Sequence, residues 1–119
     1  MVQPSKPTMH SPLFTSVDAT AVTLITLCDS CQGASWKHVL VTLVTSLVRH
    51  GEYCRSAPDA STFRRHLHDM LGAARTLRAM IRLMDHANAA QPEHLLQAHN
   101  RCDDVISLAY TALRTVDQH

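Results

Sequence analysis

Aromatic residues and glycine are scarce in this chain of 119 residues. Phe, Trp and Tyr make up 4% of the sequence, so any core must be filled by aliphatic side chains and methionine. The three glycines, Gly33, Gly51 and Gly72, are too few for a turn-rich β-sandwich or barrel, and they form no glycine-rich phosphate loop. Hydrophobic residues still reach 45%, enough for a packed core in one small domain. The composition therefore favours helices.

Glutamate is also scarce, and this bears on catalysis and metal binding. Glu52 and Glu93 are the only glutamates, whereas di-iron bundles repeat a Glu-x-x-His motif. The nine histidines are scattered and lack the His-x-x-x-His spacing with a glutamate that zinc enzymes use. We therefore predict surface histidines, with no catalytic residue, no metal ligand and no cofactor.

Four cysteines are present, and two of them are close together. Cys28-Asp-Ser-Cys31 has the spacing of half a zinc site or of a redox pair, but Cys54 and Cys102 supply no second pair. Both residues of the pair also fit an apolar helix face, where cysteine packs as a small hydrophobic residue. This usage predicts a reduced, cytoplasmic protein. We expect no membrane span, because no apolar stretch approaches the length of about 18 residues that a span requires.

Apolar residues recur every three or four positions along four segments, which predicts four one-faced helices. The predicted helices run from about Ser16 to Cys31, from an N-cap at Ser35 to about Arg55, from a cap at Asp59 or Ser61 to about Asn88, and from Gln91 and Pro92 to about Val116. The first two segments are rich in β-branched residues and would also suit buried strands, but their apolar patterns are longer than ordinary strands. We predict an all-α fold, an antiparallel up-and-down four-helix bundle over residues 13–119, preceded by a flexible arm over residues 1–12.

The third segment carries five of the eleven Lys and Arg residues, all of them arginine. At 100° per residue, most of these arginines and one histidine fall in a sector opposite the apolar face. Arginine binds phosphate through its planar fork, so the stripe indicates a nucleic-acid contact. A solvated face, paired with Asp103, Asp104 or Glu52, is the alternative. The predicted contact residues are Arg64, Arg65, His68, Arg75, Arg78 and Arg82.

Three stretches carry a family resemblance: SWKHVLVTLVTSLVRHGEY, LGAARTLRAMIRLM and PEHLLQAHNRCDDVISLAYTALRTV. In the second, small residues precede a Leu-Arg-x-x-Ile-Arg-Leu-like run. The chain resembles, over about residues 13–117, the small four-helix-bundle proteins that include the ribosomal-RNA intervening-sequence proteins and Avd, the accessory variability determinant of diversity-generating retroelements. The resemblance implies a homo-oligomeric ring, a pentamer, that is not itself an enzyme. It also implies a partner reverse transcriptase and contacts with RNA or DNA.

Two other functions stay open at the level of sequence. A plain homo-oligomeric helical adaptor for another protein would use the same apolar helices. A small ribonuclease of the HEPN type is the third, because Arg114 and His119 have the Arg-x4-His spacing of those enzymes. The position of this pair at the chain end argues against a preorganised site.

Overall fold

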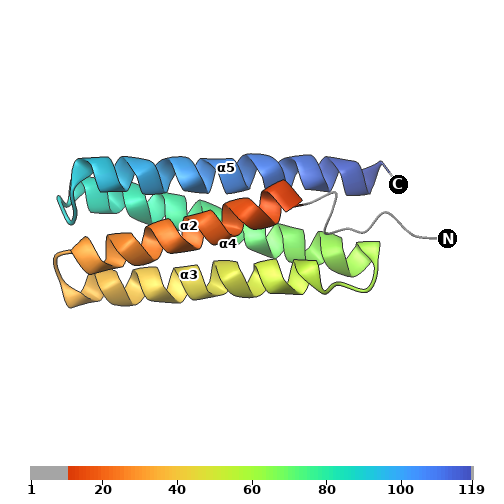
Figure 1. Cartoon of the computed structure of the whole chain (residues 1–119), viewed down its shortest axis with the longest axis horizontal. Coiled ribbons are helices and arrows are strands. Elements are labelled where there is room, and N and C mark those ends of the chain that lie inside the picture. Colours follow the sequence, from red (N-terminus) through yellow and green to blue (C-terminus); the bar gives the residue numbers. More distant parts are fainter. Residues whose placement is uncertain (1–10, 119) are drawn as a thin grey trace.

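A computed structural model describes residues 11–118, which fold into four helices (Figure 1). They are α2 (Ser11–Ser30), α3 (Ala34–Arg55), α4 (Ala60–His86) and α5 (Pro92–Asp117). No strand occurs within these residues, so the strand alternative for the first two segments is wrong and the predicted all-α bundle is confirmed. Residues 1–10 of the predicted arm lie outside the described part of the chain, whereas Ser11 and Pro12 belong to α2.

The helix boundaries follow local chemistry at most of the predicted positions. Asp59 caps α4, because its side chain accepts a hydrogen bond of 2.8 Å from the Thr62 amide. Pro92 occupies the first turn of α5, as predicted. Asn88 has a φ of 53°, and this left-handed residue follows the end of α4.

Two predicted starts were wrong. The N-cap of α3 is Gly33 and not Ser35, because Gly33 adopts a φ of 103° that reverses the chain and the helix begins at the next residue. Helix α2 starts at Ser11, ahead of the predicted Ser16, because Leu13 is buried and extends the apolar face by one turn.

Helices that follow one another in the chain pack together, and α2 also packs against α5, so the four helices form a closed square. Helix α2 therefore lies diagonally across from α4. The bundle measures 53 × 19 × 19 Å. At one end, the Gln32 amide donates a 2.9 Å hydrogen bond to the Ala89 carbonyl, which joins the α2–α3 loop to the α4–α5 loop.

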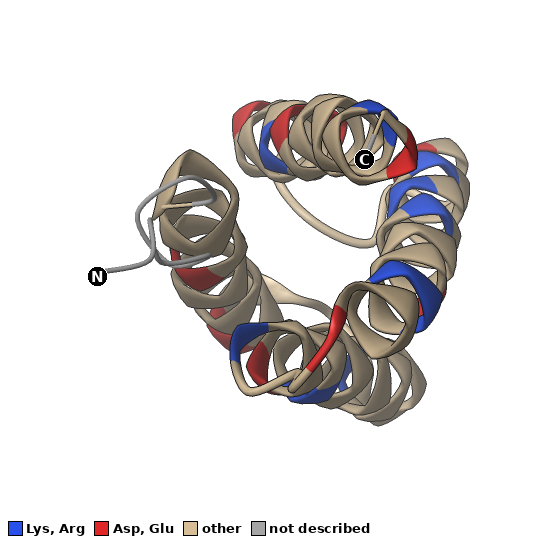
Figure 2. Cartoon of the chain, turned by 90° about the vertical axis from the view of Figure 1, so that its right-hand side faces the viewer, with Lys and Arg blue, Asp and Glu red and all other residues tan. Residues whose placement is uncertain are grey.

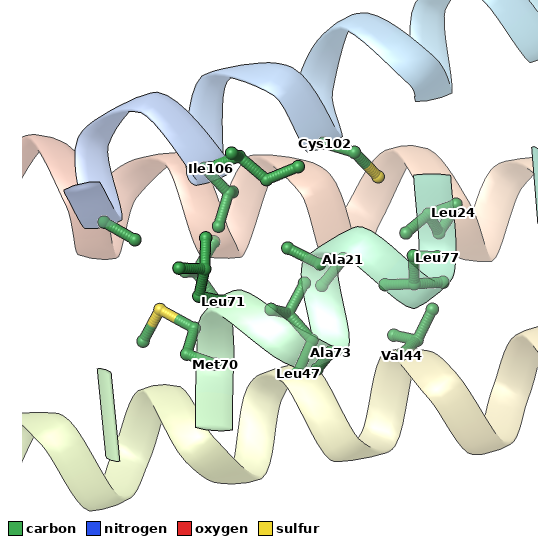
Figure 3. Close-up of a cluster of buried hydrophobic side chains, with 14 of the residues drawn as sticks. Ala21, Leu24, Val44, Leu47, Met70, Leu71, Ala73, Leu77, Cys102 and Ile106 are labelled. Atoms are coloured by element: carbon green, nitrogen blue, oxygen red, sulfur yellow. The ribbon is translucent and has the colours of Figure 1, made fainter. Parts of the chain in front are cut away.

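The core is mainly aliphatic, and Phe14 and Phe63 are its buried aromatic residues. Figure 3 shows an aliphatic part of it. The predicted inner face of α4 is buried at every position, from Phe63 through Leu77 to Met84. One polar side chain, Thr20, is fully buried among the described residues, and its hydroxyl donates to the Ser16 carbonyl at 2.7 Å. Packing of this kind, with few aromatic side chains, relies on close fit between many small contacts.

Helix α2 has a property that the sequence analysis did not anticipate. By length and composition it could cross a membrane, and 44% of its most apolar window is buried inside the bundle. The expectation that no apolar stretch reaches this length is therefore wrong. The core helix of a bundle can have the same length and composition as a membrane span.

Candidate nucleic-acid interface

The predicted arginine stripe lies along α4 on the side next to α5 (Figure 2, where α4 is on the right). Two of its members form ion pairs across that seam. Arg78 Nη1 donates a 2.8 Å hydrogen bond to Asp103 Oδ1. Arg64 Nε lies 2.8 Å from Asp117 Oδ1 without hydrogen-bond geometry, so this contact is an ion pair only. Pairing with Asp103 was one of the alternatives drawn from sequence, and pairing with Asp117 was not foreseen.

A third arginine of the stripe, Arg75, is exposed and contacts an aromatic ring. Its guanidinium carbon lies 5.3 Å from the centroid of the Tyr110 ring on α5. This is a cation–π distance, and it orients the guanidinium without neutralising its charge. Arg75 can therefore present hydrogen-bond donors to a ligand from a partly fixed position.

The remaining three predicted residues, Arg65, His68 and Arg82, are exposed. Within the described part of the chain, neither Arg65 nor Arg82 forms an ion pair with a carboxylate. The cations open to a ligand on α4 are thus Arg65, Arg75 and Arg82, with His68 beside them. We call these four residues the α4 cationic surface.

Charge is divided unevenly between two halves of the bundle. Helices α3 and α4 together carry eight Lys and Arg residues against three Asp and Glu, whereas α2 and α5 carry two against six. These pairs of helices are adjacent in the square, so the division is spatial as well as sequential. A chain with a formal charge of +1 therefore has one positive half and one negative half.

Helices α2 and α3 expose several apolar side chains. The exposed aliphatic residues of these two helices are Val22, Ile25, Val41 and Val48, and Val22 also borders the groove between α2 and α5. The Asp18–Arg55 ion pair, 3.9 Å long, joins the two helices on this side, and Ile25 and Val48 lie two turns from Asp18 and Arg55 along the same helix faces. We call these four residues the α2–α3 apolar face.

All four cysteines are buried. Burial, reinforced by Asp103, raises the pKa of the Cys102 thiol to about 12. Burial also raises the pKa of Cys28, to which Cys31 and Asp29 add, and burial raises the pKa of Cys31 itself. Thiols of this kind stay protonated at neutral pH, which suits packing better than redox chemistry.

The fold brings together one group that the sequence analysis missed, formed by His50 of α3 with His66 and Asp69 of α4. The pairing of His66 with Asp69 at i and i+3 was readable from sequence, but the approach of His50 required the antiparallel packing of α3 on α4.

The pair Arg114 and His119, which has the spacing of the HEPN ribonucleases, is described only in part. Arg114 donates a hydrogen bond of 3.2 Å to the Thr111 hydroxyl, and His119 lies outside the described residues.

Comparison of the chain with protein-family models, curated proteins and solved structures gives no match. A functional assignment therefore depends on the surfaces described above and on the resemblance found in the sequence.

Proposed function

We propose that this protein is a non-catalytic, homo-oligomeric accessory that binds RNA or DNA along α4 and works with a reverse transcriptase, as Avd-type proteins do. The observation that carries the nucleic-acid part is the α4 cationic surface on the positive half of the bundle. The polymerase partner and the retroelement setting rest on the sequence resemblance alone.

The position of the apolar face supports this combination of roles. Assembly through the α2–α3 apolar face would leave α4 outward, because α4 lies diagonally across from α2. Repetition of α4 around an assembly would then multiply the local positive field without changing the small net charge of each chain. Phosphate contacts by arginine carry little sequence information, so binding is expected to tolerate different sequences.

The test is fluorescence anisotropy with labelled single-stranded RNA and DNA over a range of salt concentrations. The informative variant is Arg75→Gln with Arg82→Gln, because neither side chain has a carboxylate partner in the described structure. Arg78 is a poorer choice, because replacing it also removes the hydrogen bond to the Asp103 carboxylate. Arg114→Gln on α5 is the matched control.

For single strands, loss of two phosphate contacts should reduce the slope of log affinity against log salt by about 1.4. Arg114→Gln should leave this slope unchanged. Equal binding by the wild type and the double variant would refute the α4 interface. Cleavage of the RNA that disappears in Arg114→Gln would instead support the ribonuclease alternative.

A second candidate, a homo-oligomeric adaptor for another protein, is favoured by one observation. Arg64 and Arg78 are already neutralised by α5, which lowers the charge that α4 offers to a polyanion. The adaptor would retain its oligomeric state and show no salt-dependent binding to either nucleic acid.

A further inference from the structure

His50, His66 and Asp69 meet on the outside of the α3–α4 seam, near the loop that joins these helices. One ligand-capable atom from each residue lies within 4.8 Å of the other two. His66 Nδ1 is 4.0 Å from Asp69 Oδ2, one helical turn away. The three side chains therefore converge on one point from two helices.

The imidazoles in this group have unsatisfied polar atoms. Nδ1 of His50 and Nδ1 of His66 are both shielded from solvent and have no hydrogen-bond partner. Shielded polar atoms are nearly always paired, and an unpaired one costs free energy. His66 Nδ1 lies beside the Asp69 carboxylate, and an added partner for the two ring nitrogens would remove this cost.

The surroundings of the group favour a fixed arrangement of the rings. The Tyr53 ring centroid lies 5.0 Å from that of His66 and 6.1 Å from that of His50. His66 is 16% exposed in its side chain, while Asp69 is 49% exposed and has freedom to move. Two rings held by packing and one mobile carboxylate can adapt to an added ion.

Two imidazoles and one carboxylate are a ligand set that zinc uses, with bond lengths of about 2.0–2.2 Å and a fourth position for water. Tetrahedral geometry at those lengths places ligand atoms about 3.3 Å apart. Atoms within 4.8 Å must therefore approach by at most about 1.5 Å, which side-chain rotations can supply.

We propose that His50, His66 and Asp69 form a zinc site that clamps α3 to α4. The ion would satisfy both ring nitrogens and would join the two helices of the positive half of the bundle. This site is independent of the proposed nucleic-acid function, because none of its three ligands belongs to the α4 cationic surface.

The experiment uses the full chain after treatment with a chelator. Isothermal titration with Zn²⁺ gives the stoichiometry and affinity, and Co²⁺ substitution reports the ligands through its visible spectrum. His50→Gln and His66→Gln are the test variants. His38→Gln, at an exposed position of the same helix as His50, is the matched control. A Cys28→Ser, Cys31→Ser variant tests the competing thiol pair.

We expect one Zn²⁺ per chain, a tetrahedral cobalt spectrum without thiolate charge transfer, and a rise in the unfolding temperature with zinc. Each test variant should weaken binding at least tenfold, while His38→Gln and the cysteine variant bind as the wild type does. Weak binding that no variant changes, or loss confined to the cysteine variant, would overturn the site. If a test variant fails to fold, a thiolate band in the wild-type cobalt spectrum would still refute the proposal.

Discussion

The α2–α3 apolar face leads to a quantitative prediction about self-association. Val22 is 65% exposed, Ile25 and Val41 are each 56% exposed, and Val48 is 36% exposed. Full burial of an exposed Val or Ile contributes about 1.5–3 kcal/mol. Scaled by the exposed fractions, covering this face would contribute about 3–6 kcal/mol per protomer before the cost of association.

The perturbation is the double substitution Ile25→Lys and Val41→Lys. These two residues account for about half of the exposed apolar fraction, so their loss should remove about 1.7–3.4 kcal/mol of association free energy per protomer. Burying the two lysine side chains in the subunit interface would also cost desolvation free energy. Because 1.4 kcal/mol corresponds to a factor of ten, association should weaken more than tenfold. Both positions face solvent within one chain, and lysine has good helix propensity, so the bundle itself should stay folded.

Sedimentation equilibrium at micromolar to tens of micromolar protein measures the effect, with circular dichroism as the check on folding. Leu83→Lys is the matched control, because Leu83 is 53% exposed but lies on α4, away from this face. A wild type that is monomeric over this range would refute the prediction. So would a double variant with the same mass as the wild type, or dissociation of the assembly by Leu83→Lys to the same extent.

Three further predictions concern stability and are measured by denaturant unfolding. Asp59→Ala should cost about 1 kcal/mol by removing the cap of α4, and Asp59→Asn should retain most of it. Gly33→Ala should cost about 1–3 kcal/mol because of the positive φ, whereas Gly72→Ala, in a helix with open space around it, should stabilise by about 0.5–1 kcal/mol. Because the pKa of Cys102 is raised in the folded state, the thiol loses its proton at lower pH in the unfolded chain than in the folded one. Below about pH 9 this residue should therefore not affect how the free energy of unfolding depends on pH. Between pH 9 and 12 it should lower the free energy of unfolding by about 1.4 kcal/mol per pH unit. Cys102→Ala should flatten that slope, and an unchanged slope would contradict the assignment.

Helix positions and inner faces were predictable from sequence because both depend on local periodicity. Leu67, Met70 and Leu77 repeat at helical spacing, and the fold buries all of them. The start of α3 was not predictable in the same way. Ser35 has the side chain of a common N-cap, but the backbone reversal at Gly33 decides where the helix begins.

The candidate sites were less predictable, since they depend on which helices lie side by side. The periodicity of α4 groups its arginines, but only the packing of α5 reveals that Asp117 and Asp103 pair with Arg64 and Arg78. The convergence of His50 with His66 likewise depends on the register between α3 and α4. A one-dimensional pattern contains no information on that register beyond the need to bury apolar faces.

The division of charge between the two halves of the bundle has a consequence for any complex with a polyanion. A chain that binds through α4 and assembles through the α2–α3 apolar face would leave the sides formed by its acidic helix α5 exposed in the complex. A second strand that approached those sides would meet carboxylates, so coating should stop at one layer. The coated nucleic acid would keep a negative outer charge and stay dispersed, where a uniformly basic protein would condense it into aggregates.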